Sequence, residues 1–143
     1  MNRSSGILLP VSALPGPCGI GDLGADARDF IDFLAAAGQR YWQILPLNPP
    51  DGAHSPYLSA STFAGSTDLL SPEPFLARGA LTADEVRAID WGADPMRVDY
   101  DRVYAGRTAL WDAAFAREKA SAAPALRAAL AAEPWLRDYC LYM

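Results

Sequence analysis

The sequence predicts an α/β fold that begins with one strand–helix–strand unit and continues as a mainly helical region. Two short, continuous apolar runs, residues 6–10 and 41–45, have the pattern of strands buried on both faces. Between them, apolar residues recur at helical spacing, and beyond residue 66 the periodic segments are helical. Two strands joined by one helix in under 50 residues imply parallel pairing with a right-handed crossover.

The first unit is expected to occupy residues 1–66, a long loop included. Its helix should run over residues 25–37, with an apolar face followed by Gly38 as the stop signal. The face consists of Phe30, Phe33, Leu34 and Ala37. A turn-rich segment, residues 12–22, precedes this helix, and the second predicted strand, residues 41–45, begins shortly after the helix ends.

Residues 67–143 are expected to form a separate, mainly helical part. Residues 69–76 look irregular, and a capping box at Thr82–Glu85 opens a short helix. A long helix is predicted over residues 100–119, and two further helical stretches are separated at Glu133–Pro134. An apolar helical face runs to the final residue without a Gly cap or a basic last turn. We therefore expect the natural chain to continue beyond Met143.

Composition excludes several classes of function. With 51% hydrophobic residues the chain can bury a core, and a net charge of −5 without any basic run argues against nucleic-acid binding. Cys18 and Cys140 match no metal or redox spacing, so both are expected to be buried thiols, and one histidine cannot support a His-rich metal site. We expect no metal and no cofactor. No signal-peptide core and no membrane-length apolar run occur, so a cytoplasmic protein is expected.

The run Gly19-Ile20-Gly21-Asp22-Leu23-Gly24 matches the dinucleotide-binding pattern of three spaced glycines. That function needs the glycines directly after a strand and an acid about 20 residues on, and neither condition is met. A tight turn into the helix is the better interpretation. Asp22, Asp26 and Asp29 lie near the start of that helix, so they are expected to be solvated or capping acids.

The loop from Pro46 to Gly65 is the best candidate for a binding site. Its length indicates function or disorder, and its aromatic residues, which look buried, argue against disorder. Pro56 restricts Ser55 to an extended backbone. Tyr57 offers a ring that can stack on the C–H face of a sugar and a hydroxyl that can bond to it. The alternative, in which Tyr57 packs on Phe63 and pins the loop, is equally compatible with the sequence.

Several ordered motifs resemble 4-α-glucanotransferase, the amylomaltase or disproportionating enzyme of glycoside hydrolase family 77. They span nearly the whole chain in register. The motifs are Arg3–Leu9, Leu14–Pro17, Gly19–Gly24, Tyr41–Leu47, Ser55–Tyr57 with Phe63–Gly65, Val98–Tyr100 and Trp135–Tyr139. The resemblance implies the N-terminal portion of a (β/α)8 TIM barrel with a helical insertion. Such a barrel takes about 250 residues, so it would be incomplete in this chain.

The resemblance implies transfer of α-1,4-glucan segments between malto-oligosaccharides and glucose by retaining double displacement. The two carboxylates of that mechanism lie downstream in the family, so no catalytic residue is assigned and this chain alone is expected to be inactive. Ser55 and Tyr57 match positions that line the substrate cleft. Tyr104 matches a position of a second glucan site, whose aromatic partner is replaced here by Gly52-Ala53.

Two positions beside the substrate loop depart from the family pattern. His54 stands where an Asp is usual, and Ser66-Thr67 replaces the usual Asn-Pro, so acceptor preference could differ. The alternative from another class of protein is a non-catalytic glucan-binding or helix-mediated interaction module. Oligomeric state is not predicted.

Overall fold

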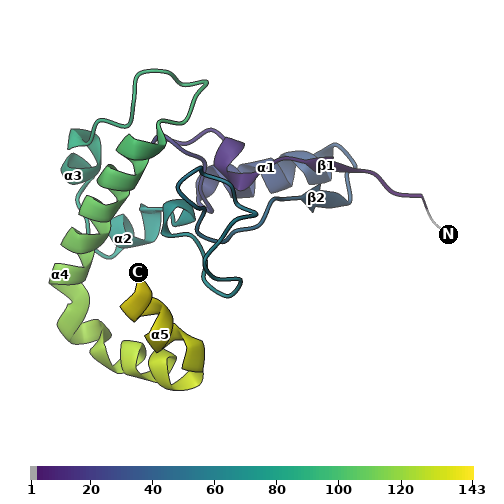
Figure 1. Ribbon diagram of the computed structural model, residues 1–143. Helices are drawn as coiled ribbons and strands as arrows, with labels where there is room; N and C mark the ends of the chain where they lie inside the picture. Colours follow the sequence, from purple (N-terminus) through teal and green to yellow (C-terminus); the bar gives the residue numbers. More distant parts are fainter. Residues whose placement is uncertain (1–2) are drawn as a thin grey trace.

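The computed structural model describes residues 3–143 and confirms the strand–helix–strand unit at the start of the chain (Figure 1). Strand β1 (Gly6–Leu8) pairs in parallel with β2 (Tyr41–Gln43), and helix α1 (Ala25–Ala36) connects them. The register sets Ile7 beside Trp42. A short 3-10 helix, η1 (Val11–Ala13), follows β1 directly.

Helix α1 packs against the strands through aromatic residues. Phe30 meets the ring of Trp42 edge-on, with 5.1 Å between the ring centroids, and the Trp42 indole donates a 2.8 Å hydrogen bond to the Leu9 carbonyl. Gly38, at φ +70°, ends the helix as predicted, because its left-handed backbone suits glycine. A small core forms beneath. Its buried members are Val11, Leu14 and Ala27.

The prediction that both strands are buried on both faces is wrong. All three residues of β1 are exposed, Leu8 to 57%, and Tyr41 at the start of β2 is 64% exposed. The sheet within residues 3–143 has only two strands, so each has one edge without a partner. Strand residues with the composition of a buried sheet therefore remain on the surface.

The glycine run forms the tight turn expected of it. Gly19 adopts φ +72°, a left-handed conformation that favours glycine. A Cβ atom on Gly21 would lie 2.2 Å from the Val11 carbonyl oxygen, closer than any side chain permits. Gly24 then occupies the N-cap of α1. The turn packs against η1 and leads directly into the helix.

The second half is helical, with two differences from the prediction. After the 3-10 helix η2 (Thr67–Leu69), helix α2 (Glu73–Ala77) forms in a segment expected to be irregular. Helix α3 (Ala83–Ala88) has the predicted capping box between Thr82 and Glu85. Helix α4 (Tyr100–Ala132) is one 33-residue helix with Pro124 inside it, rather than two stretches. Helix α5 (Pro134–Tyr142) follows after the predicted break.

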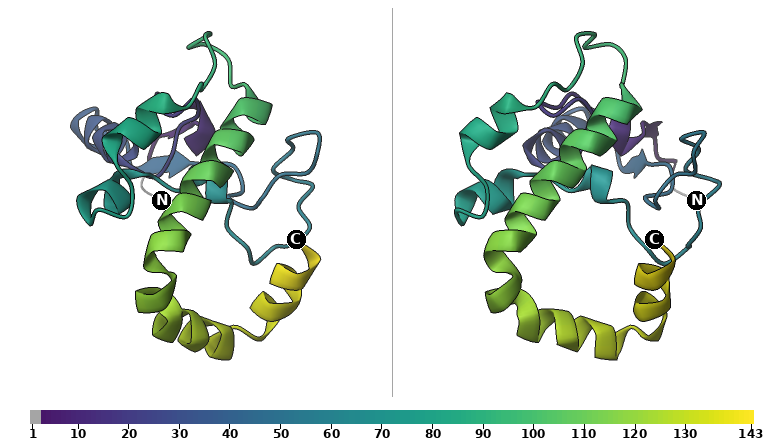
Figure 2. Two further views of the ribbon diagram at one scale, coloured as in Figure 1. Left: turned by 90° about the vertical axis from the view of Figure 1, so that its left-hand side faces the viewer. Right: turned by 60° about the vertical axis from the view of Figure 1, so that its left-hand side comes forward.

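Helix α4 curves along its second half and brings α5 back toward the long loop (Figure 2). Its first half packs on a second core formed with α2 and α3. In that core Phe75 and Trp111 have ring centroids 4.9 Å apart, and Leu81 and Leu110 are 2% exposed. Cys18 is buried as expected, but Cys140, on α5, is exposed, so the prediction of a buried thiol is wrong for Cys140.

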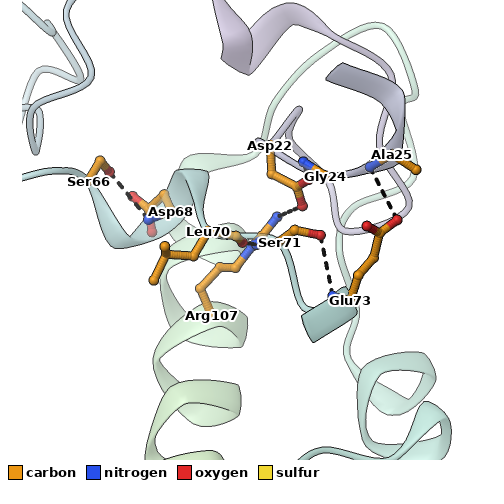
Figure 3. Close-up of polar contacts among 9 residues, drawn as sticks. All are labelled: Asp22, Gly24, Ala25, Ser66, Asp68, Leu70, Ser71, Glu73 and Arg107. Carbon is orange, nitrogen blue, oxygen red and sulfur yellow. Dashed lines mark hydrogen bonds and ion pairs between the residues drawn. The ribbon is translucent and has the colours of Figure 1, made fainter. Parts of the chain in front are cut away.

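A buried ion pair connects the two halves of the chain (Figure 3). Arg107, on α4, is 1% exposed and places Nη2 3.2 Å from Oδ2 of Asp22, in the glycine turn. The same guanidinium donates to the Leu70 carbonyl. Asp22 also accepts a 2.9 Å hydrogen bond from the Gly24 amide, so it does serve the start of α1. The prediction that it is merely a solvated or capping acid is nevertheless wrong.

Candidate functional site

The loop from Pro46 to Gly65 has an ordered base beyond the carboxyl end of β2. The Asn48 side-chain amide donates to the Ser61 and Ala64 carbonyls at 3.1 and 3.0 Å. The amide of Ser66, the residue directly after the loop, donates to the carbonyl of Leu47, near the start of the loop, at 2.7 Å. These bonds bring the two ends of the loop together. The loop is therefore a closed structure with its own internal hydrogen bonds, as compact surface loops with functional roles commonly are.

The tip of the loop is organised by Asp51. Its Oδ1 accepts hydrogen bonds from the amides of Ala53, at 3.1 Å, and Ser55, at 2.9 Å, while its carbonyl accepts one from the His54 amide at 2.9 Å. His54 adopts φ +59°, which is uncommon outside glycine but is tolerated by His and Asn. Its ring lies flat on Tyr100, with 4.1 Å between centroids and 10° between planes.

A cavity of about 310 Å³ opens between the loop, the segments that follow both strands, η2 and the start of α4. Its wall is mostly apolar, with a few polar groups, as in sites for small molecules. The polar or aromatic groups on the wall belong to Ser12, Asn48, His54, Ser66, Asp68 and Tyr100. Because loops beyond the carboxyl ends of parallel strands bind ligands in many α/β proteins, this cavity is the candidate site.

Asp68 supplies the acidic group of the cavity wall. Burial raises the pKa of its carboxyl above the usual range, while the charges of Arg107 and His54 act in the opposite direction. Its amide is held by the Ser66 hydroxyl, which accepts at 3.3 Å (Figure 3). A carboxyl on this wall can accept or donate a hydrogen bond to a ligand hydroxyl.

The predicted site residues occupy three different environments. Ser55 is half-buried on the loop tip, and Tyr57 is 69% exposed beside it. Tyr104 is 68% exposed, one turn of α4 beyond Tyr100. Within residues 3–143 no hydrogen bond or ring contact joins these three side chains. Their substrate roles stay predictions.

The alternative in which Tyr57 packs on Phe63 is wrong. Phe63 instead stacks on Trp135 of α5, with ring centroids 5.7 Å apart and planes at 28°. Neither loop aromatic is buried as expected, since Phe63 is 73% exposed. The ring of Tyr57 therefore remains free for a ligand.

The sequence did not predict that His54 stacks on Tyr100 or that Asp68 lines the cavity. Both involve α4, whose Tyr100 meets the loop tip and whose Arg107 acts on Asp68, and no local pattern encodes that packing. The proline-flanked Asn48 carried a weak signal, because Asn side chains often bond to the backbone of turns. Across residues 3–143 no cluster of His, Cys, Asp and Glu could hold a metal ion. None of the helices described is long and apolar enough to cross a membrane.

Together, the parallel strands and the closed loop beyond them define an α/β protein with a candidate ligand-binding cavity at the carboxyl edge of its sheet. The chain belongs to the 4-alpha-glucanotransferase family, whose model matches residues 9–143. This result confirms the family resemblance of the sequence motifs.

Curated relatives extend the match over almost the whole chain. The 4-alpha-glucanotransferase of Thermus thermophilus is 44% identical over 146 aligned positions, covering 99% of this chain and 28% of that protein. The enzyme of Streptococcus pneumoniae serotype 4 is 44% identical over 115 residues, covering 80% and 23%. The chain therefore spans about a quarter of the length of these relatives.

A solved structure shares the fold. The amylomaltase from Streptococcus agalactiae, in complex with acarbose, matches with a TM-score of 0.88 and 36% identity. The match covers 96% of this chain and 28% of that one. The arrangement of β1, β2, the loop and the helices is thus that of an amylomaltase segment.

Proposed function

We propose that this chain is part of a 4-α-glucanotransferase that transfers α-1,4-glucan segments between malto-oligosaccharides and glucose by retaining double displacement. The observation that carries the proposal is the likeness, at TM-score 0.88 over 96% of this chain, to an amylomaltase described as a complex with acarbose. The family match over residues 9–143 supports it. A separate glucan-binding or helix-mediated interaction module is not favoured by these relatives.

In this proposal β1, α1 and β2 are the first unit of a (β/α)8 barrel, and residues 67–143 are a helical insertion. The exposed apolar residues of both strands support this, because barrel strands are covered by neighbours on each side. A barrel takes about 250 residues, more than this chain provides. The loop after β2 would then lie on the face where barrel enzymes bind their substrates.

Ser55 and Tyr57 are proposed to contact the glucan. The exposed ring of Tyr57 can stack on a pyranose face, and its hydroxyl can bond to the sugar. Tyr104 is proposed for a second glucan contact on α4, weakened by the absence of an aromatic residue at Gly52-Ala53. The two carboxylates of a retaining mechanism are proposed to come from outside these 143 residues. The cytoplasmic location also stays a prediction.

Binding of maltoheptaose to the 143-residue chain, followed by NMR, tests the contact residues. Tyr57→Ala should raise the dissociation constant about two- to twelvefold, because stacked rings contribute about 0.5–1.5 kcal/mol. Phe115→Ala is the matched control, since Phe115 is also an exposed aromatic, 55%, but lies on α4 away from the loop. An unchanged dissociation constant for Tyr57→Ala would remove Tyr57 from the site.

A maltotriose disproportionation assay tests the absence of the carboxylates. The chain alone should release no glucose. Glucose release above the background of a boiled sample would show that the catalytic acids lie within these 143 residues.

A further inference from the structure

We propose that His54 is a positioning residue: its stacking on Tyr100 holds the tip of the loop against α4 and thereby places Ser55 and Tyr57. Here the tip means residues 51–58. The ligand that Ser55 and Tyr57 meet rests on the proposed function, whereas the positioning itself does not.

The contact joins the loop to a fixed point. Tyr100 is the first residue of α4, and Asp99 caps that helix by accepting a 3.2 Å hydrogen bond from the Arg102 amide. A 3.0 Å ion pair between Asp99 and the Arg102 side chain reinforces the same turn. The Tyr100 ring therefore stands on a well-anchored helix end. The His54 ring lies 4.1 Å from it and nearly parallel.

The hydrogen-bonded turns of the tip connect His54 to the proposed binding residues, Ser55 and Tyr57. The Asp51 carboxylate bonds to the amides on either side of His54, so residues 51–55 form one hydrogen-bonded turn. The Leu58 amide donates to the Ser55 carbonyl at 3.2 Å, and this second turn contains Tyr57. Because His54 lies within these linked turns, fixing its ring on Tyr100 fixes the orientation of both turns.

Among the hydrogen bonds and ring pairs of the described residues, no other contact performs this task. The bonds of Asn48 organise the base of the loop, not its tip. Within residues 3–143 no hydrogen bond connects residues 49–60 to any helix, and no other stacked ring pair involves the tip. Without the stack, no hydrogen bond or ring pair would hold the two turns except at their ends.

The backbone of His54 permits a clean separation of its two roles. At φ +59° Asn is tolerated, so His54→Asn removes the ring and keeps the turn. Tyr100→Leu removes the partner ring from the helix side without touching the loop. Tyr100→Phe keeps that ring and is the matched control.

The order of the Ser55 and Tyr57 amides, measured by ¹⁵N relaxation on the 143-residue chain, tests the positioning. In the wild type and in Tyr100→Phe the order parameter should be near that of rigid backbone, about 0.85. In His54→Asn and Tyr100→Leu it should fall below about 0.6. The double variant His54→Asn/Tyr100→Leu should be no more mobile than either single variant. Rigid amides in both single variants would overturn the proposal.

Maltoheptaose titration of the same samples separates this proposal from the proposed function. The dissociation constant should rise about fivefold in His54→Asn and Tyr100→Leu, and stay at the wild-type value in Tyr100→Phe. If the wild type binds no maltoheptaose but the loop amides lose order in both variants, the positioning stands and the glucan function fails. If it binds and the amides keep their order, the positioning fails and the function stands. Matching unfolding temperatures exclude a global change.

Discussion

At the scale of single residues, the most consequential contact is the ion pair between Arg107 and Asp22. Both groups are buried, and the guanidinium also lies 5.8 and 5.9 Å from the ring centroids of Trp91 and Trp111. The residues are 85 positions apart in the chain, so no spacing rule could have paired them. A buried pair costs desolvation when it forms, and removing one partner leaves an unpaired charge in the interior.

Arg107→Leu should lower the free energy of unfolding by about 3–5 kcal/mol, because Asp22 would be left charged and buried. Urea unfolding followed by circular dichroism measures this. The exposed pair of Arg28 and Glu73 supplies the control, and Arg28→Gln should change the midpoint little. Arg107→Leu/Asp22→Asn should recover part of the loss. A loss below about 1 kcal/mol for Arg107→Leu would show that the pair does not hold the two halves together.

At the scale of elements, local patterns predicted the starts of α1, α3 and α4 and the end of α1, but missed α2 and the full length of α4. The capping box at Thr82 and Glu85 is a contact within one turn, so its sequence signature is sufficient. The length of α4 depends on packing instead. Pro124 lacks an amide hydrogen and normally breaks a helix, yet the helix continues through it to Ala132.

The pH dependence of α3 follows from Glu85. The hydrogen bond from Arg117, together with those from the Thr82 amide and hydroxyl, lowers the pKa of its carboxyl from 4.5 to about 2. A lowered pKa stabilises the fold above the unfolded value, and this contribution is lost as the pH falls from about 4.5 toward 2. Glu85→Gln should therefore be less stable than the wild type near neutral pH. Thermal unfolding should show this difference shrinking over that acidic range; a difference independent of pH would contradict the assignment.

Pro124→Ala should raise the helix content and loosen the contact between α5 and the loop. Proline inside a helix commonly bends it, and α4 curves in the half that contains Pro124 (Figure 2). Far-UV circular dichroism measures the gain in helix, and nuclear Overhauser effects between Phe63 and Trp135 report on the contact. An intact contact in the variant would mean that the bend has another cause.

At the scale of the whole molecule, the chain consists of two small cores and a sheet with two open edges. Buried residues gather around Val11 in the first core and around Leu110 in the second. The sheet residues Ile7, Leu8 and Tyr41 are 42%, 57% and 64% exposed. Open edges and apolar strands are surfaces on which copies of a chain associate.

The 143-residue chain should therefore self-associate as its concentration rises. Sedimentation velocity over a dilution series measures this, and Leu8→Lys should shift the distribution toward monomer because a charge on an exposed strand opposes edge pairing. Leu126→Lys, on the exposed part of α4, is the control. Monomers at every concentration, with a cooperative thermal transition, would show that the exposed strands are tolerated.

The sequence by itself determined the strand–helix–strand order, the glycine turn, the capping box, the family and the loop that carries Ser55 and Tyr57, because each of these is recognised from short runs of neighbouring residues. Only the tertiary structure decided that Asp22 pairs with Arg107, that His54 stacks on Tyr100 and that Phe63 meets Trp135 rather than Tyr57. These contacts join segments tens of residues apart: Arg107 and Tyr100 belong to α4, and Trp135 belongs to α5. The exposure of the strands was missed for a related reason. An apolar run indicates that a strand is suited to burial, but whether it is buried depends on which neighbouring elements are present.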